Sequence, residues 1–201
     1  MARKRIIDTC AASDDAVAIM MARQTPDIEV EAITIVAGNM PVEQGSMNAR
    51  YTVELCGKDV PVYHGADKPL IREVYRAYFF HGPDGMGGMN YQAKTPPAEG
   101  HAVDVLIDTI KANPGIMLVT LGPMTNVALA VSQAPEIVEN VSRCVVMGGA
   151  VGFGLASGLY VATAFRTIDR LGCRVDELET RDPLTGLPNG RATRSLLYTC
   201  P

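Results

Sequence analysis

The sequence predicts an α/β protein with a doubly wound, mostly parallel sheet. Short apolar and β-branched runs alternate along residues 1–150 with longer segments that suit helices. Glycine, proline or asparagine follows most of these segments, as at Gly57, residues 113–115 and residues 122–123. Parallel strands need crossover connections that are usually helical, so this alternation favours a parallel sheet covered by helices.

Residues 5–19 predict the first strand and the first helix. Ile6 and Ile7 form a short apolar run, and an alanine-rich segment too long for one strand follows it. We expect a buried strand, a tight turn and a buried helix with Ser13 as its N-cap. Asp14 and Asp15 then occupy the first helical turn, where the helix dipole favours anions.

The remaining elements follow in order along the chain. β-branched and aliphatic residues predict further strands at residues 28–37, 60–63, 116–121 and 145–147. Helices are expected at residues 41–55, 99–112 and 125–132, and a short helix opens at Pro135. Residues 66–98 have no regular pattern, and a loop of this length inside a compact domain is usually functional or disordered.

Three carboxylates gather where the first strand ends. Asp8, Asp14 and Asp15 lie just beyond its carboxyl end, the edge at which open α/β sheets bind ligands. Oxygen ligands of this kind suit a hard cation better than a soft metal. The alternative is that Asp14 and Asp15 only stabilise the start of the helix, and the local pattern leaves both interpretations open.

The run from Asp8 to Ala16 resembles the amino-terminal signature D-x-D-x-x-x-D-D of the inosine-uridine preferring nucleoside hydrolases. Those enzymes cleave the N-glycosidic bond of ribonucleosides with a bound calcium ion. The resemblance implies that Asp15 binds Ca²⁺ with Asp8 in support, and that Asp14 binds the ribose hydroxyls and takes part in catalysis.

Cys10 departs from this signature, because the family has an aspartate there that serves as base and calcium ligand. A thiol is a poor ligand for a hard cation and is mostly protonated at neutral pH. We therefore expect Cys10, at the catalytic base position, to lower both calcium binding and turnover.

Three further segments extend the resemblance. Residues 37–39 match the family's glycine–asparagine pair at a strand end, which implies that Asn39 lies in the ribose pocket. Residues 80–85 resemble its H-G-x-D-G loop, which implies a catalytic His81, and residues 121–129 resemble the segment in which the Leu121 carbonyl would coordinate calcium. Taken alone, Asn39 is typical of a turn and His81 of a loop surface.

The resemblance ends near residue 150. We find no counterpart of the family's later ribose-binding loop or helical half, so we expect a truncated hydrolase-like part, residues 1–150, and a foreign or aberrant tail, residues 151–201, that packs poorly on the sheet. Residues 144–165 contain no charge and are long enough to span a membrane, although their glycines suit a soluble strand and loop equally well. Residues 177–201 resemble the start of a GGDEF (diguanylate cyclase) domain through the run Arg-Asp-Pro-Leu-Thr-Gly-Leu-Pro-Asn.

Composition limits the partners and the compartment. The 201-residue chain has a net charge of −4, which gives no support to nucleic-acid binding. Its five cysteines are odd in number and widely spaced, which predicts reduced thiols in a cytoplasmic protein. A homo-oligomer is compatible with the sequence.

Three functions stay open at this stage. The resemblance implies a calcium-dependent hydrolase that converts ribonucleosides to ribose and base. The second function is a non-catalytic remnant of such an enzyme. The third is a membrane-tethered signalling fragment, which only residues 144–189 favour. The sequence defines no base preference.

Overall fold

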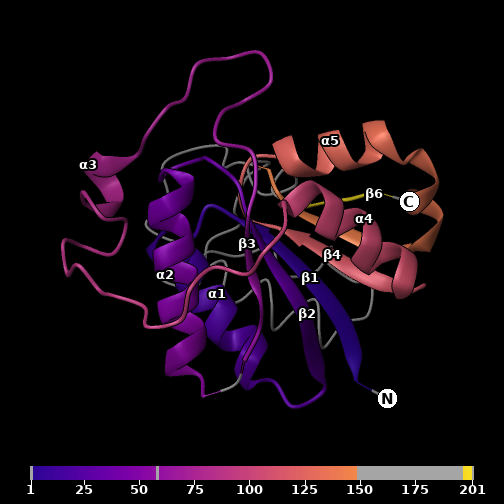
Figure 1. Cartoon of the computed structure of the whole chain (residues 1–201), viewed down its shortest axis with the longest axis horizontal. Helices are drawn as coiled ribbons and strands as arrows, with labels where there is room; N and C mark the ends of the chain where they lie inside the picture. The colour runs from indigo at the N-terminus through magenta and orange to yellow at the C-terminus, as the bar shows by residue number, and fades with distance from the viewer. Residues whose placement is uncertain (1, 58, 149–196, 201) are drawn as a thin grey trace, which may run out of the picture.

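The computed structural model describes residues 2–57, 59–148 and 197–200 of the chain (Figure 1). Within them, one six-stranded sheet has the order β3-β2-β1-β4-β5-β6. The strands are β1 (Arg3–Thr9), β2 (Ile28–Ile35), β3 (Val62–His64), β4 (Ile116–Thr120), β5 (Val141–Met147) and β6 (Leu197–Cys200). The first five strands pair in parallel, which confirms the predicted doubly wound α/β fold.

Helices cover both faces of this sheet. They are α1 (Ser13–Gln24), α2 (Val42–Leu55), α3 (Tyr78–His81), α4 (Ala102–Ala112), α5 (Thr125–Gln133) and the 3₁₀ helix η1 (Pro135–Asn140). Figure 1 shows α1 and α2 together on one side of the sheet, and α4 and α5 on the other.

Alternate residues of β1 supply the two hydrophobic cores between these layers. Ile7 belongs to the core that includes residues of α1 and α2, and its neighbour Ile6 belongs to the core that includes residues of α4 and α5. Both side chains are fully buried. Burial of an isoleucine side chain stabilises a fold by about 1.5–3 kcal/mol, so these two residues stabilise the packing of helices on both faces of β1.

Several predicted boundaries are wrong, and one of them changes the site. Ala12, with an extended backbone, is the N-cap of α1, and no side chain caps this helix. Ser13 is instead the first helical residue, and its hydroxyl contacts His81 rather than the helix backbone. The helix expected from residue 99 begins at Ala102, where a ring nitrogen of His101 accepts a hydrogen bond from the Val103 N–H group.

The described part of the tail is a single strand. Strand β6 pairs antiparallel with residues 144–147 of β5. For the rest of residues 151–201, poor packing on the sheet stays a prediction. Because residues 144–147 are in β5, a membrane-spanning helix does not begin at Cys144. Among the described residues, every helix is too short or too polar to cross a bilayer. The rest of the expected span, residues 149–165, and residues 177–196 of the GGDEF-like segment lie outside the described residues.

The strand order places a crevice beside the end of β1. The chain adds β2 and β3 on one side of β1, and β4 and β5 on the other. The loops that follow β1, β2 and β4 therefore meet at the carboxyl edge of the sheet, at the point where the winding direction reverses.

Candidate active site

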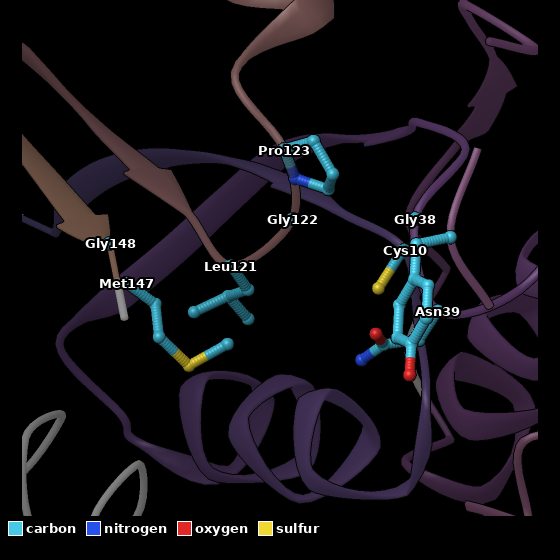
Figure 2. Close-up of a pocket in the computed structure, with 9 residues that line it drawn as sticks. Cys10, Gly38, Asn39, Leu121, Gly122, Pro123, Met147 and Gly148 are labelled. Carbon is cyan, nitrogen blue, oxygen red and sulfur yellow. The ribbon is translucent and has the colours of Figure 1, made fainter. Parts of the chain in front are cut away.

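A pocket of about 300 Å³ lies at this edge of the sheet (Figure 2). It is formed by residues that follow β1, β2, β4 and β5, together with one tyrosine from the long loop. The lining residues are Cys10, Gly38, Asn39, Tyr75, Leu121, Gly122, Pro123, Met147 and Gly148. Cys10, Asn39 and Leu121 are thus brought to one cavity from three separate strand ends.

Glycines allow the neighbouring loops to pack directly against Cys10. A Cβ atom on Gly38 would lie 2.8 Å from Cβ of Cys10 and 2.8 Å from Cδ of Pro123. A Cβ atom on Gly122 would lie 2.9 Å from the Cys10 nitrogen. Any side chain at either position would push the loops apart, so the glycines set the width of the pocket.

A buried network holds Asp8 at the end of β1. Its Oδ1 atom accepts hydrogen bonds from Thr34 Oγ1 at 2.6 Å and from Asn126 Nδ2 at 2.8 Å. Burial raises the pKa of Asp8 to about 7, although these two donors oppose the effect. The charged form of Asp8 is therefore unfavourable unless a cation or a further hydrogen-bond donor approaches its other oxygen, Oδ2.

Asn126 was not predicted as a site residue, although it connects three segments. Its Nδ2 group also donates to the Ile35 carbonyl at 3.1 Å, and its Oδ1 atom accepts from the Ala66 N–H group at 2.8 Å. The first turn of α5 thus holds the ends of β1 and β2 and the loop after β3. The only sequence signal was its place in the segment 121–129.

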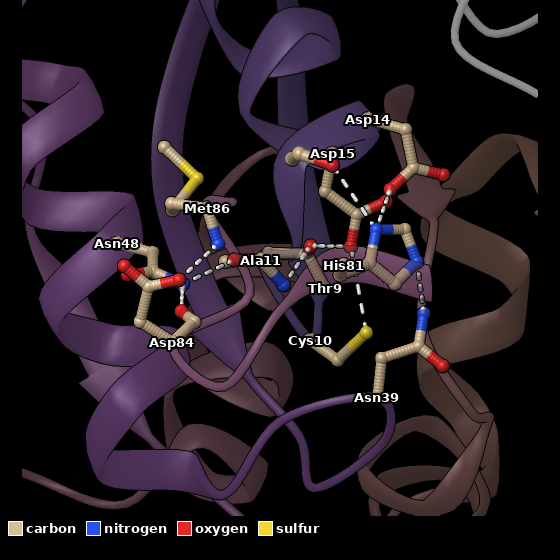
Figure 3. Close-up of polar contacts among 11 residues, drawn as sticks. Thr9, Cys10, Ala11, Asp14, Asp15, Asn39, Asn48, His81, Asp84 and Met86 are labelled. Carbon is tan, nitrogen blue, oxygen red and sulfur yellow. Dashed lines mark hydrogen bonds and ion pairs between the residues drawn. The ribbon is translucent and has the colours of Figure 1, made fainter. Parts of the chain in front are cut away.

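Asp15 lies in the first turn of α1 and is 1% exposed. Its Oδ2 atom accepts a hydrogen bond from Thr9 Oγ1 at 2.7 Å, and the Cys10 thiol donates to the same oxygen at 3.6 Å (Figure 3). Burial, and then the charge of Asp14, raise the pKa of Asp15.

The same surroundings raise the pKa of the Cys10 thiol well above its ordinary value, through burial first and the Asp15 charge second. At neutral pH Cys10 is therefore a protonated hydrogen-bond donor. It does not accept a proton from water, which a catalytic base must do.

The turn that carries Cys10 has a strained backbone. Ala11, the next residue, has a positive φ of 50°, which is uncommon for a residue with a side chain. Its N–H group donates to Thr9 Oγ1 at 2.9 Å, and its carbonyl accepts from Asn48 Nδ2 at 3.0 Å. Asn48 also donates to the Asp84 carbonyl, so α2 fixes this turn and the loop after α3 together (Figure 3).

His81 joins the site from the long irregular loop. It lies in α3, is 7% exposed and has its Nδ1 atom 3.0 Å from Oγ of Ser13 and 3.9 Å from Oδ1 of Asp14. Its Nε2 atom lies 3.3 Å from Nδ2 of Asn39. Loop, helix and strand end therefore meet at one imidazole ring (Figure 3).

The carboxylates at this edge offer oxygens to a cation. Three of the buried carboxylate oxygens without a hydrogen-bond partner in the described residues lie at this edge, namely Oδ2 of Asp8, Oδ1 of Asp14 and Oδ1 of Asp15. Leu121 is held beside them, because its N–H group donates to the Asp8 carbonyl at 2.8 Å. Buried oxygens without donors are what a hard cation would satisfy.

The donor set is nevertheless incomplete for calcium. Cys10 supplies a thiol where a hard cation needs oxygen. In the described part of the chain, no group of three histidine, cysteine or acidic side chains is arranged to hold a metal ion. The residues present thus fit a calcium ion only in part, and Cys10 is the residue that does not fit.

Comparison with known proteins agrees with this geometry. Residues 5–165 match the family described as inosine-uridine preferring nucleoside hydrolase, and the match continues past residue 150. The chain is 43% identical to the inosine-uridine preferring nucleoside hydrolase of Leishmania major, over 78% of this chain and 52% of that protein. It is 40% identical to the pyrimidine-specific ribonucleoside hydrolase RihB of Escherichia coli, over 76% of this chain and 49% of that protein.

Solved structures give the same result. The plant nucleoside hydrolase PpNRh1 superposes with a TM-score of 0.70 at 36% identity, over 75% of this chain and 49% of that chain. The purine-preferring ribonucleoside hydrolase of Gardnerella vaginalis superposes with a TM-score of 0.69 at 34% identity, over 74% and 49% of the two chains. The chain thus spans about half the length of the curated relatives it matches. It belongs to the inosine-uridine preferring nucleoside hydrolase family.

Proposed function

We propose that this chain hydrolyses ribonucleosides to ribose and base, at a rate that Cys10 holds far below that of a relative with a carboxylate there. The observation that carries the proposal is the convergence of Asp14, Asn39 and His81 beside Cys10 and Asp15 in a family member. The activity of the whole protein is part of the proposal, because the chain spans about half of its relatives.

Asp14 and Asn39 would bind the sugar of the substrate. Oδ1 of Asp14 is buried and accepts no hydrogen bond within the described residues, so it is available to a ribose hydroxyl. Asn39 lines the pocket and offers a second polar group to the same sugar. Two such contacts would orient the ribose and leave the base free to extend along the pocket.

Calcium is the proposed cofactor, and it would be held by Asp8, Asp15 and the Leu121 carbonyl. A bound calcium ion makes a neighbouring water molecule more acidic. Because Cys10 contributes a protonated thiol to this shell, we propose that calcium binds weakly to the chain as it stands.

The reaction also needs a proton acceptor. In hydrolysis, the oxygen of water bonds to C1′, the bond between C1′ and the base nitrogen breaks, and that nitrogen gains a proton. The water loses a proton in the same process, and a neighbouring carboxylate is suited to accept it. Cys10 occupies that place as a thiol, which is the reason for the low rate that we propose.

The second candidate is a protein that binds ribonucleosides without cleaving them. The hydrogen bond from the Cys10 thiol to Asp15 favours this candidate, since it leaves the pocket formed while the base is missing. We also propose a cytoplasmic location, which rests on the odd number and wide spacing of the cysteines.

Release of ribose from inosine and uridine tests the proposal. The unmodified chain, Cys10→Asp and Asp15→Ala would be assayed with calcium and with a chelator, and nucleoside binding would be measured by calorimetry. We expect slow release by the unmodified chain, at least about tenfold faster release by Cys10→Asp, and none by Asp15→Ala. Cys56→Asp, far from the pocket at the end of α2, is the matched control.

The outcomes separate the candidates. Binding without release in both the unmodified chain and Cys10→Asp would favour the binding protein. Rapid release by the unmodified chain would contradict the role given to Cys10. The absence of both binding and release in every variant would contradict the proposed function.

A further inference from the structure

Two polar side chains restrict the position of the proton on the His81 ring. Nε2 lies 3.3 Å from Nδ2 of Asn39, and Nδ1 lies 3.0 Å from Oγ of Ser13. The ring is 7% exposed, so these two side chains are close polar neighbours of a mostly buried imidazole. In such a site the partner of one ring nitrogen decides the protonation of the other.

Asn39 identifies the nitrogen that accepts. An amide NH₂ group is a donor only, so Nε2 of His81 must present a lone pair to it. A ring protonated at Nε2 would bring two donors together at 3.3 Å. With the Asn39 amide oriented as in the structure, this contact places the ring proton on Nδ1.

The hydroxyl oxygen of Ser13 is placed to accept a hydrogen bond from a proton on Nδ1. Its hydroxyl oxygen is 3.0 Å from Nδ1, whereas Oδ1 of Asp14 is 3.9 Å away and too distant for a hydrogen bond. As the first residue of α1, Ser13 is fixed by the helix that packs on the sheet. The backbone of Ser13 is therefore held at one place relative to the ring.

We propose that Ser13 is a positioning residue for Asn39 and that it acts through His81. By accepting the Nδ1 proton, Ser13 keeps Nε2 as an acceptor, and Nε2 keeps the NH₂ group of Asn39 turned toward the ring. Figure 3 shows the oxygen of the Asn39 side chain on the side away from His81. Since Asn39 lines the pocket, this arrangement presents an acceptor to a ligand hydroxyl.

The last step rests on the proposed function, because a ribose hydroxyl is the group that this acceptor would bind. The arrangement of Ser13, His81 and Asn39 itself does not depend on a ligand. Its test therefore uses a spectroscopic signal of the free protein as well as ligand binding.

Nitrogen NMR of the imidazole rings distinguishes the two tautomers directly. Spectra of histidine-labelled protein would be recorded at mildly alkaline pH for the unmodified chain, Ser13→Ala and Ser13→Thr. The His81 signals would be assigned by their loss in His81→Gln. Ser142→Ala is the matched control, since this hydroxyl donates to the Ile116 carbonyl at the amino ends of β4 and β5, away from the carboxyl edge of the sheet.

We expect His81 to carry its proton on Nδ1 in the unmodified chain, in Ser13→Thr and in Ser142→Ala. In Ser13→Ala the Nδ1 proton loses its acceptor, and a substantial fraction of the ring should shift to the tautomer protonated at Nε2. An unchanged His81 tautomer in Ser13→Ala would overturn the proposal. So would a Ser13→Thr variant that behaves like Ser13→Ala, because the hydroxyl would then not be the cause.

Inosine binding gives the second readout. Ser13→Ala should bind about threefold to tenfold more weakly than the unmodified chain, and Ser13→Thr should restore the affinity. If no variant binds a ribonucleoside while the His81 tautomer still responds to Ser13→Ala, the proposed function fails and the positioning role of Ser13 is supported. If the variants bind equally well despite a changed tautomer, Ser13 does not position Asn39 for the ligand, and the proposal fails.

Discussion

The sulfur of Cys10 lies 3.6 Å from Oδ2 of Asp15, and the thiol donates a hydrogen bond to that carboxylate. Two neighbouring carboxylates at these positions would repel each other and attract a cation, whereas a neutral thiol beside a carboxylate does not repel it. The thiol gives Asp15 a hydrogen-bond donor without adding a second negative charge beside it. The same contact removes an oxygen donor and a proton acceptor from the pocket.

Cys10→Asp should therefore make stability depend on calcium. In calcium-free buffer we expect a loss of about 1–3 kcal/mol in the free energy of unfolding, because an unpaired carboxylate is buried beside Asp15. Calcium at about 100 times its dissociation constant should return about 2.7 kcal/mol by mass action. Urea unfolding with calcium or chelator measures both effects.

The unmodified chain and Cys56→Asp serve as references for this prediction. Both should show little change in unfolding between calcium and chelator, because neither adds an oxygen donor to the pocket. A calcium response in the unmodified chain equal to that of Cys10→Asp would contradict the interpretation of Cys10.

Asn126→Ala should lower the free energy of unfolding by about 2–4 kcal/mol, since it removes the hydrogen bonds to Asp8 and Ile35 and leaves buried groups unpaired. Asn126→Asp should cost more, because it places a second carboxylate beside buried Asp8. Asn113→Ala, which loses hydrogen bonds nearer the surface, should cost less than about 1 kcal/mol. Equal stability of Asn126→Asp and the unmodified chain in urea would show that the network is not important for folding.

Asp84 should make the loop after α3 sensitive to acid. Burial raises the pKa of Asp84, but the N–H groups of Met86, Asn90 and Gly88 outweigh it and hold the pKa below its ordinary value. An aspartate whose pKa is lower in the folded state stabilises the fold at pH values above its unfolded-state pKa of about 3.9. This stabilisation is lost as the pH falls through the folded-state pKa. The difference in unfolding free energy between the unmodified chain and Asp84→Asn should thus be complete near neutral pH and shrink below about pH 4. A difference that stays constant from neutral to acidic pH would contradict this assignment.

Arg76 should affect ligand binding without touching the ligand. One guanidinium nitrogen donates to the Gly38 carbonyl at 3.0 Å and to the Met40 carbonyl at 2.6 Å, so it closes the turn that carries Asn39. Arg76→Met should weaken inosine binding about threefold to tenfold and change the unfolding free energy by less than about 1 kcal/mol. Arg72→Met, an exposed position on the same loop, is the control in calorimetry and should leave the affinity unchanged. A decrease in the free energy of unfolding that is larger than the decrease in the free energy of binding would assign Arg76 a role in folding instead.

The strand ends of the site were predictable, and its cross-connections were not. Asp8, Asn39 and Leu121 each follow an apolar run, and parallel strands end at one edge, so periodicity alone places them together. The contact of Ser13 with His81 joins residues 68 positions apart, and His81 lies in a segment without periodicity. Serine before two acidic residues is typical of an N-cap, and only the packing of α3 on α1 gives its hydroxyl a different partner.

Asn126 shows the same limit for a buried residue. At the start of a helix an asparagine is typical of a cap, and its side chain instead reaches three other segments. The burial of Cys10 could not be predicted from the local sequence either, since Gly38 and Gly122 pack against it from loops distant in the sequence. These contacts follow from the order of the strands in the sheet, which local patterns do not encode.

The central position of β1 also has a consequence for the nascent chain. Residues 3–9 leave the ribosome before the other strands of the sheet, and β2 covers one of their edges soon afterwards. The other edge, with fully buried Ile6 and Ile7, gains its partner only when residues 117–120 of β4 have been made. Throughout that interval an apolar strand presents unpaired N–H and C=O groups, which is the condition under which chains associate wrongly. The strand that ends at the candidate site thus has one edge unpaired while residues 10–116 are synthesised.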